Sequence, residues 1–334
     1  MSVFFFDLHT DILTDIAIRR EAGEKSVFDS RHYPILKRNH IDTLICVIWV
    51  EPKYKDNKLE RFNDLVSYAL ADFNESAHVH LCTSSLDMKQ NSDKINIFLG
   101  IEGMSFLKEA VSPLTKNTIS SYFDKLHHIG FRTGILAWNE INDLASGSAA
   151  YNADKQAAKG LTDIGALVVQ KMMELRWLVD VSHLDERTFW DIYHLKEYPI
   201  FASHSNAKAL CNHERNLTDQ QLKAIAKRNG LIGINAYAGF LNKGKASIDD
   251  YIDHIEYIAN LIGMEYVALG FDFMNYLEPH DLGTSFSERT DMLTSADDVQ
   301  ELISRLKRLN WDQKAIQMIT EDNAKRFIKN MDKG

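Results

Sequence analysis

The sequence predicts an α/β protein whose strands close into a (β/α)8 TIM barrel. Short runs of apolar, β-branched or aromatic residues alternate with longer amphipathic segments along the 334 residues, which is typical of repeated strand and helix units. Histidines and carboxylates directly follow several of these runs. Because the carboxyl ends of all strands open on one face of a parallel barrel, side chains that are distant in the sequence can meet there.

Eight segments have the length and composition of buried parallel strands, and eight strands close this type of barrel. The expected strands are 3–8, 41–49, 96–101, 131–138, 177–182, 199–203, 230–236 and 266–271. The expected helices are 60–76, 117–129, 155–175, 186–195, 218–228, 249–262, 296–309 and 312–329. Thr218 and Ser247 are suitable N-caps, and Gly130, Gly230 and Gly263 stand where helices should end.

The segments are expected to form one domain over 1–334, because the chain has only five prolines and no Gly/Ser-rich or Pro-rich linker divides it. The alternative fold is a doubly wound open sheet, which gathers its site from a few strands at a topological switch point. Neither a G-x-G-x-x-G motif nor a P-loop occurs in the sequence to support that alternative.

The composition excludes several classes of partner. The chain has 38 Lys and Arg against 47 Asp and Glu, a formal net charge of −9, so nucleic acid is not an expected partner. Cys46, Cys82 and Cys211 form no C-x-x-C pair and are odd in number, which argues against a disulfide framework and against a thiolate zinc site. A reducing compartment fits best.

The start of the chain, Met-Ser-Val-Phe-Phe-Phe-Asp, lacks the basic region of a signal peptide, and its apolar run is too short for one. Since no stretch of about 18 apolar residues occurs, no membrane span and no membrane partner are expected. We therefore expect a soluble, cytoplasmic protein. A homodimer remains open.

Metal-ligand residue types cluster where the first predicted strand ends. Asp7, His9 and Asp11 are two residues apart from one another, so an extended backbone points all three the same way, with Asp7 deepest in the barrel. Histidine nitrogen and carboxylate oxygen suit zinc and also admit manganese, cobalt or iron. On its own this pattern is a weak signal, because polar strand ends also cap neighbouring backbone.

Three further strand ends carry the same residue types. Glu102 lies between Gly100 and Gly103 at the end of a buried strand, a costly place for a carboxylate unless a cation meets it. His183 and His204 end two later strands; either one alone would more often be a hydrogen-bonded structural histidine. Three histidines and two carboxylates exceed the needs of one tetrahedral ion with an open position. Two ions sharing Glu102 would use all five, as in metal-dependent hydrolases.

Six short motifs occur in order along the chain. They are Asp7-Leu8-His9-Thr10-Asp11, Gly100-Ile101-Glu102-Gly103, Val181-Ser182-His183, Ser203-His204-Ser205, Arg215-Asn216 and Gly270-Phe271-Asp272-Phe273. Together they resemble the motifs of the membrane (renal) dipeptidases and their bacterial relatives, which belong to the amidohydrolase superfamily of barrel metalloenzymes. The resemblance spans the chain from the first predicted strand to the eighth.

The resemblance implies two divalent ions per chain, most often Zn²⁺, and a small dipeptide as substrate. Its ligands would be His9 and Asp11 for one ion, His183 and His204 for the other, and Glu102 as the bridge. A hydroxide bridging the ions would attack the peptide bond and release two free amino acids.

The resemblance also implies roles outside the metal ligands. Asp272 would transfer a proton to the leaving amine, while Arg215 and Tyr237 would bind the substrate. Each of the last two has a simpler reading: Arg215 could form a surface ion pair with the nearby Glu214 or Asp219, and Tyr237 could be a core residue after a buried strand.

The sequence departs from the family pattern in two places. Where the best-known mammalian members have a histidine that helps stabilise the oxyanion, this chain has Trp138, followed by Asn139. We expect both to line the substrate site, but an indole N–H can donate a hydrogen bond and cannot take up a proton. The acidic residue and glycine expected after Phe273 are replaced by Met274 and Asn275, so the loop after the last strand is expected to differ.

Two other functions stay open from the sequence. One is a different barrel amidohydrolase, such as a deaminase or a hydrolase of N-acyl amino acids or related amides. Many of those enzymes open with H-x-H and use one metal or a carboxylated lysine, which this chain does not offer at the first or fourth predicted strand. The other is a metal-binding barrel without catalytic turnover.

Overall fold

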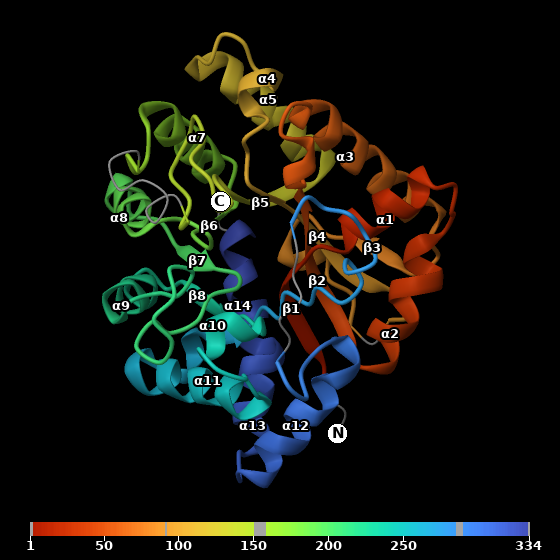
Figure 1. Cartoon of the computed structure of the whole chain (residues 1–334), viewed down its shortest axis with the longest axis vertical. Helices are drawn as coiled ribbons and strands as arrows, with labels where there is room; N and C mark the ends of the chain where they lie inside the picture. Colours follow the sequence, from red (N-terminus) through yellow and green to blue (C-terminus); the bar gives the residue numbers. More distant parts are fainter. Residues whose placement is uncertain (1–2, 91, 150–157, 285–289, 333–334) are drawn as a thin grey trace.

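The computed structural model describes residues 3–90, 92–149, 158–284 and 290–332. Within them, eight parallel strands form a closed barrel and helices surround it (Figure 1). The predicted TIM barrel is confirmed. In barrel order the strands are β1 (Phe5–Thr10), β2 (Ile41–Trp49), β4 (Ile95–Glu102), β5 (Phe131–Ile135), β6 (Leu178–Asp180), β7 (Ile200–Ala202), β8 (Leu231–Ile234) and β9 (Val267–Leu269), which pairs with β1 again.

A short strand, β3 (Val79–Leu81), lies beside the barrel and was not predicted. It pairs with the first residues of β4, Ile95 to Ile97, on the edge that β5 occupies from Leu99 onward. The opposite edge of β4 pairs with β2 along seven register positions, from Thr43 to Trp49. The barrel therefore closes without β3.

The predicted helices are present where the structure describes them, and α1, α2, α4 and α10 were not predicted. They are α1 (Ile12–Glu21), α2 (Tyr33–Arg38), α3 (Lys58–Glu75), α4 (Leu107–Ala110), α5 (Lys116–Ile129), α7 (Asp163–Glu174), α8 (Glu186–Leu195), α9 (Asp219–Lys227), α10 (Ala238–Leu241), α11 (Ile248–Ile262), α12 (Val299–Arg308), α13 (Gln313–Gln317) and α14 (Asn323–Ile328). The helix expected over 155–175 falls partly outside the described residues, and the one expected over 312–329 is α13, a π-helical turn and α14.

The predicted helix-end signals hold at most positions. The side chains of Thr218 and Ser247 accept hydrogen bonds from the N–H of Gln221 and Asp250, closing capping boxes on α9 and α11. Gly130 and Gly263 follow α5 and α11 with φ of 122° and 109°, a conformation that favours glycine.

Gly230 has a different reason for being glycine. Helix α9 ends at Lys227, so Gly230 lies beyond its cap. A Cβ at Gly230 would stand 2.0 Å from the carbonyl oxygen of Ile200 in β7. The residue allows a close approach of two neighbouring strands, as glycine in sheets often does.

One end of the barrel is closed by packing. Inside it, the rings of Phe6 and Phe98 stack with centroids 6.1 Å apart, and Phe327 of α14 packs on Phe201 at 5.1 Å. A larger apolar layer lies between the outer strand faces and the helices. The barrel interior is therefore a core, which leaves the carboxyl ends of the strands for a site. None of the described helices has the length and apolar composition needed to cross a membrane.

Candidate metal centre

The predicted metal ligands meet at the carboxyl ends of the strands. Each ligand is one of the last two residues of a strand or lies within three residues after it. His9 and Asp11 belong to the end of β1, Glu102 to that of β4, His183 to that of β6 and His204 to that of β7. All five residues are buried, and no more than 6% of the surface of any of them is exposed to solvent. The structure therefore brings together residues spread over 196 positions of sequence, from 9 to 204.

Glu102 is at the middle of this cluster. Its Oε2 lies 3.5 Å from His9 Nε2, and its Oε1 lies 2.8 Å from His183 Nε2 and 3.5 Å from His204 Nε2. Two groups of three can each hold one ion, with ligand atoms within 4.8 Å of one another: His9, Asp11 and Glu102, and Glu102, His183 and His204. One carboxylate thus faces both groups.

The donor atoms fit divalent ions by distance and by what they lack. Tetrahedral ligands with bonds of 2.0 to 2.2 Å stand about 3.3 to 3.6 Å apart, and His9 Nε2 lies 3.6 Å from Asp11 Oδ2. Within the described part of the chain, His9 Nε2, His204 Nε2 and Asp11 Oδ1 are buried with no hydrogen-bond partner. Buried polar atoms without a partner are rare and costly, and bound cations would give all three a partner.

The electrostatics of the cluster agree with this fit. Burial raises the pKa of Glu102 to about 8, so the ionised carboxylate needs a positive partner. Burial also lowers the pKa of His183 and His204 well below the ordinary value, with Arg215 and His9 adding to the effect. Both rings are therefore neutral, which is the form of histidine that binds metal.

His9 differs from the other two histidines. Burial alone would lower the pKa of His9, but Glu102 and Asp11 together raise this pKa well above its ordinary value. In the metal-free protein His9 therefore carries the positive charge that balances the carboxylates. To hold a metal ion, His9 would have to give up that proton.

Asp7 has a structural contact instead of a place in either ligand group. Its Oδ1 accepts hydrogen bonds from the backbone N–H of Phe271 at 2.9 Å and of His9 at 3.3 Å. Burial raises its pKa to about 7. Asp7 therefore links β1 to the segment after β9, and it lies deeper than His9 and Asp11, as the alternation along β1 predicts.

Two of the site residues have an unusual backbone. His183 and Asp272 have φ of 64° and 57°, in the left-handed region that non-glycine residues rarely adopt. Both follow short strands, and both line the same cavity. Backbone strain of this kind is concentrated at functional sites.

A cavity of about 250 Å³ opens above the cluster. Its lining includes the carboxylates and histidine of the candidate metal centre and every predicted substrate residue: Asp11, Glu102, His183, Asp272, Arg215, Tyr237, Trp138 and Asn139. The residues proposed from the sequence for metal and for substrate thus share one space.

Asp272 is placed beside the metal cluster and not within it. Its Oδ2 accepts a hydrogen bond from Asn235 Nδ2 at 3.0 Å, and its Oδ1 is 4.0 Å from His9 Nε2. Burial raises the pKa of Asp272 to about 6, with Asp11 also raising it and His9 and Arg215 acting against the rise. A carboxylate with a pKa near neutrality suits proton transfer.

Arg215 is buried, with 5% of its surface exposed, so it is no surface residue. Its Nη2 donates to the carbonyl oxygen of His204 at 3.1 Å, and its guanidinium lies over the ring of Phe240 at 5.4 Å. Its Nε is buried without a hydrogen-bond partner, and no described carboxylate lies in ion-pair contact with it. The sequence-based alternative of an ion pair with Glu214 or Asp219 is therefore wrong.

Tyr237 and Trp138 form parts of the cavity wall. Tyr237 follows β8, and its ring contacts Phe240 at 4.8 Å. The Trp138 ring lies 5.8 Å from the ring of His183 and 5.2 Å from that of Trp49. Both are partly exposed to the cavity, so the simpler reading of Tyr237 as a fully buried core residue does not hold.

Asn139 contacts a candidate ligand. Its Oδ1 lies 2.8 Å from His183 Nδ1 and also accepts a hydrogen bond from Ser148 Oγ at 3.3 Å. Sequence reasoning gave it a substrate role only. Trp49 and Asn235 were not predicted, since neither is a metal-ligand type, although the position of Trp49 at the end of β2 could have marked it.

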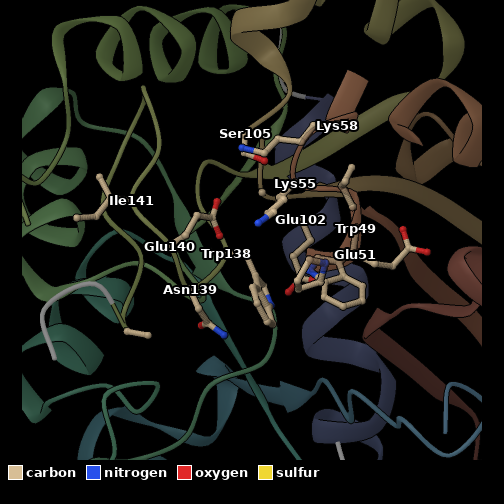
Figure 2. A pocket seen from close by; sticks show the side chains of 14 residues that line it. Trp49, Glu51, Lys55, Lys58, Glu102, Ser105, Trp138, Asn139, Glu140 and Ile141 are labelled. Atoms are coloured by element: carbon tan, nitrogen blue, oxygen red, sulfur yellow. The ribbon is translucent and has the colours of Figure 1, made fainter. Parts of the chain in front are cut away.

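A second cavity of about 540 Å³ adjoins the first at Glu102, Trp138 and Asn139. Trp49 and Trp138 line it beside Glu102, and Lys55 and Lys58 are also among its lining residues (Figure 2). Glu51 also borders it, but its carboxylate is occupied by Arg61, whose Nε and Nη2 donate at 2.8 and 2.6 Å. The site therefore has room beyond the metal cluster.

Comparisons with known proteins find related sequences. An uncharacterised protein of Klebsiella pneumoniae from the pqqA 5′ region is 34% identical over 200 residues, which are 58% of this chain and 70% of that protein. An uncharacterised dipeptidase of Schizosaccharomyces pombe is 30% identical over 203 residues, 60% of this chain and 46% of that protein. The chain thus spans less than half of the yeast relative.

Solved structures share the fold. A metallopeptidase from Rhodobacter sphaeroides, liganded with a phosphinate mimic of the dipeptide L-Ala-D-Ala, has a TM-score of 0.83 at 17% identity, covering 99% of this chain and 100% of that one. A model of the membrane dipeptidase family, peptidase family M19, matches residues 2–333. The chain therefore belongs to the membrane dipeptidase family of metallopeptidases.

Proposed function

We propose that this chain is a zinc-dependent dipeptidase with two metal ions, which hydrolyses dipeptides to free amino acids. The observation that carries the proposal is the position of Glu102, whose two carboxylate oxygens face two separate groups of ligand atoms. The buried guanidinium of Arg215, which has no ion-pair partner among the described residues, shares the cavity with them. A small substrate with a carboxylate would complete both features.

In this proposal His9 and Asp11 hold one ion, His183 and His204 hold the other, and Glu102 bridges the pair. When bound, two divalent ions supply a nucleophilic water of lowered pKa and polarise a carbonyl oxygen. The neutral state of His183 and His204 follows from their burial, so these ligands need not lose a proton before binding.

The remaining steps fall to the chain's own side chains. Asp272, with its pKa raised to about 6, takes a proton from the attacking water and passes it to the leaving amine. Arg215 binds the terminal carboxylate through its unpartnered N–H groups, in the planar arrangement that matches a carboxylate. Tyr237 and Trp138 enclose the substrate from two sides of the cavity.

Two adjoining cavities suit a substrate with two residues. With the carboxyl-terminal residue at Arg215, the side chain of the first residue would extend past Glu102 into the space lined by Trp49 and Trp138. The dipeptide mimic bound by the Rhodobacter relative supports a substrate of this size. An N-acyl amino acid also has a carboxylate for Arg215 and an acyl group for the second cavity, so it is the competing substrate class.

The test combines metal analysis with a substrate panel. Zinc-loaded protein should hold close to two ions per chain by elemental analysis, and it should cleave dipeptides faster than N-acetyl amino acids of the same carboxyl-terminal residue. Glu102→Gln should lower the affinity for both ions. The matched control Glu174→Gln, on the exposed end of α7, should lower the affinity for neither. One ion or none after loading would refute the two-metal centre, and preference for the N-acetyl compounds would refute the dipeptidase.

We also propose that residues 1–334 act as one domain in the cytoplasm. Cys46, Cys82 and Cys211 are buried free thiols, which fits a reducing compartment. Titration with a thiol reagent in denaturant and without reductant would check this, since all three cysteines of each chain should react as free thiols.

A further inference from the structure

All three candidate histidine ligands have their second ring nitrogen engaged. His183 Nδ1 lies 2.8 Å from Asn139 Oδ1, His204 Nδ1 lies 2.7 Å from Ser203 Oγ, and His9 Nδ1 lies 3.3 Å from the same Ser203 Oγ. A neutral imidazole that gives Nε2 to a metal keeps its proton on Nδ1. Each ring therefore needs an acceptor at Nδ1, and two rings share one hydroxyl.

The hydroxyl of Ser203 can serve both rings because it has two lone pairs and one proton. With the metal-binding tautomer it would accept from the Nδ1–H of His9 and of His204, and its own proton would be free to turn toward the nearby carboxylate of Asp180. Burial raises the pKa of Asp180, and a side-chain hydrogen bond from Ser203 acts against that rise. Asp180 is itself fixed, since its Oδ1 accepts from the backbone N–H of Ser182 at 2.9 Å and of Ser203 at 3.1 Å.

The backbone of Ser203 is also held in place. A Cβ at Gly233 or at Gly270 would stand 1.9 or 1.8 Å from the carbonyl oxygen of Ser203. The two glycines in β8 and just after β9 therefore let the chain close around this residue. Its hydroxyl is presented to the two rings by a backbone that has no room to shift.

His9, Asp180 and His204 could by distance hold an ion of their own, since their ligand atoms lie within 4.8 Å of one another. The Ser203 hydroxyl, however, is within hydrogen-bond distance of both Nδ1 atoms. The centroids of the two rings are only 3.7 Å apart, although the rings belong to different ligand groups. This side of the histidines is thus a support for the metal centre.

We propose that Ser203, held by Asp180, is a positioning residue that sets the tautomer of His9 and His204 and so supports both metal positions at once. Asn139 supports only the position that uses His183. The inference rests on the two-metal centre of the proposed function. It adds a physical link between the two ions that does not pass through Glu102.

The test measures the affinity of each ion by zinc titration against a chelator, in the full-length protein. Loss of a residue that orients a metal-ligating histidine lowers metal affinity by about 10- to 100-fold. Ser203→Ala should therefore lower the affinity for both ions by about that factor, whereas Asn139→Ala should lower the affinity for one ion only. Ser205→Ala is the matched control, because both serines are 1% exposed and Ser205 Oγ has no partner within the described residues.

Folding is checked separately by thermal unfolding of the metal-free variants. If Ser203→Ala does not fold, Asp180→Asn replaces it, since its amide oxygen can still accept from the two backbone N–H groups while an NH2 group replaces the second carboxylate oxygen beside Ser203; the binding of both ions should again weaken. Ser203→Thr keeps a hydroxyl and should retain more affinity than Ser203→Ala. A wild-type protein without two ions would refute the proposed function. Two ions in the wild type and an unchanged or single-ion effect in Ser203→Ala would overturn this inference alone.

Discussion

Replacing Arg215 by methionine removes the guanidinium and keeps a side chain of similar length, and we expect the effect to depend on the carboxylate of the substrate. The side chain is 5% exposed. Its side-chain hydrogen bond goes to the carbonyl oxygen of His204 at 3.1 Å, and its Nε has no partner in the described structure. A free dipeptide would supply the missing anion, whereas its carboxyl-terminal amide would not.

The magnitude follows from the burial of this charge. Burial lowers the pKa of Arg215 from 12.5 to about 10, which at 1.36 kcal/mol per pKa unit disfavours the charged form by about 3 kcal/mol. A carboxylate that pairs with Arg215 relieves this, and a hydrogen bond to a charged group contributes about 1.5 to 3 kcal/mol. Arg215→Met should therefore lower kcat/KM for a dipeptide by about 10- to 100-fold.

The assay compares initial rates on a dipeptide and on its amide for the wild type, Arg215→Met and Arg215→Lys. The amide should lose less than about threefold in Arg215→Met, and lysine should restore only part of the activity, because it offers a point charge in place of a planar fork. Equal losses for the acid and the amide would refute the reasoning. The thermal midpoint of the metal-free variant should stay level or rise, since an unpaired buried charge is removed; a large fall would mean that Arg215 is structural.

Two further substitutions test single carboxylates. Asp272→Asn should lower kcat by about 100-fold or more while zinc content stays near wild type; loss of metal in parallel with activity would reassign Asp272 as a ligand. Asp15 tests stability: despite its burial, hydrogen bonds and charges from His32, His280 and Arg19 hold its pKa below the usual value. The stabilisation is therefore present above the unfolded pKa of about 4 and lost as pH falls below it. Asp15→Asn should cost about 3 kcal/mol at pH 7, measured by denaturant unfolding, and the difference should shrink below about pH 4; a constant difference would contradict the assignment.

The fold was predictable where hydropathy and geometry agree. The observed β2 has the predicted bounds, Ile41–Trp49, because its apolar run is long and buried throughout. By contrast, β6 and β9 are three residues long and shorter than predicted. The apolar runs in the sequence continue beyond both strands. The backbone, however, stops pairing with its neighbours before His183 and Asp272, which have positive φ. The hydropathy of the sequence does not indicate this change of backbone conformation.

At β1 the observed strand ends later than predicted, because polar residues continue it. The apolar run suggested a strand over 3–8, yet the strand extends to Thr10 because Asp7 and His9 are buried with partners from other strands. Helix α1 was missed for a related reason. Its first six residues, 12–17, are all buried, so they show no amphipathic stripe of helical period.

The site was predictable by residue type and position, and less so by contact. Histidines and carboxylates at strand ends marked the candidate ligands, because a parallel barrel gathers strand ends by topology alone. Ser203, Asp180 and Asn235 each have a hydrogen-bond partner that lies 23 or more residues away in sequence. No local pattern shows such pairings; only the closed barrel does.

The closure of the barrel also explains why Asp7 is buried without binding a metal. β1 and β9 meet in a single register pair, Asp7 with Leu269, which is a weak join between the strand that supplies His9 and the one that precedes Asp272. Asp7 adds to it by accepting the N–H of Phe271 at 2.9 Å, one residue before Asp272. This hydrogen bond therefore links the strand that supplies the proposed metal ligand His9 to the segment that carries the proposed proton-transfer group. Burying the carboxyl group of Asp7 costs free energy. In return, its hydrogen bond keeps β1 and the segment after β9 in register beside the proposed site.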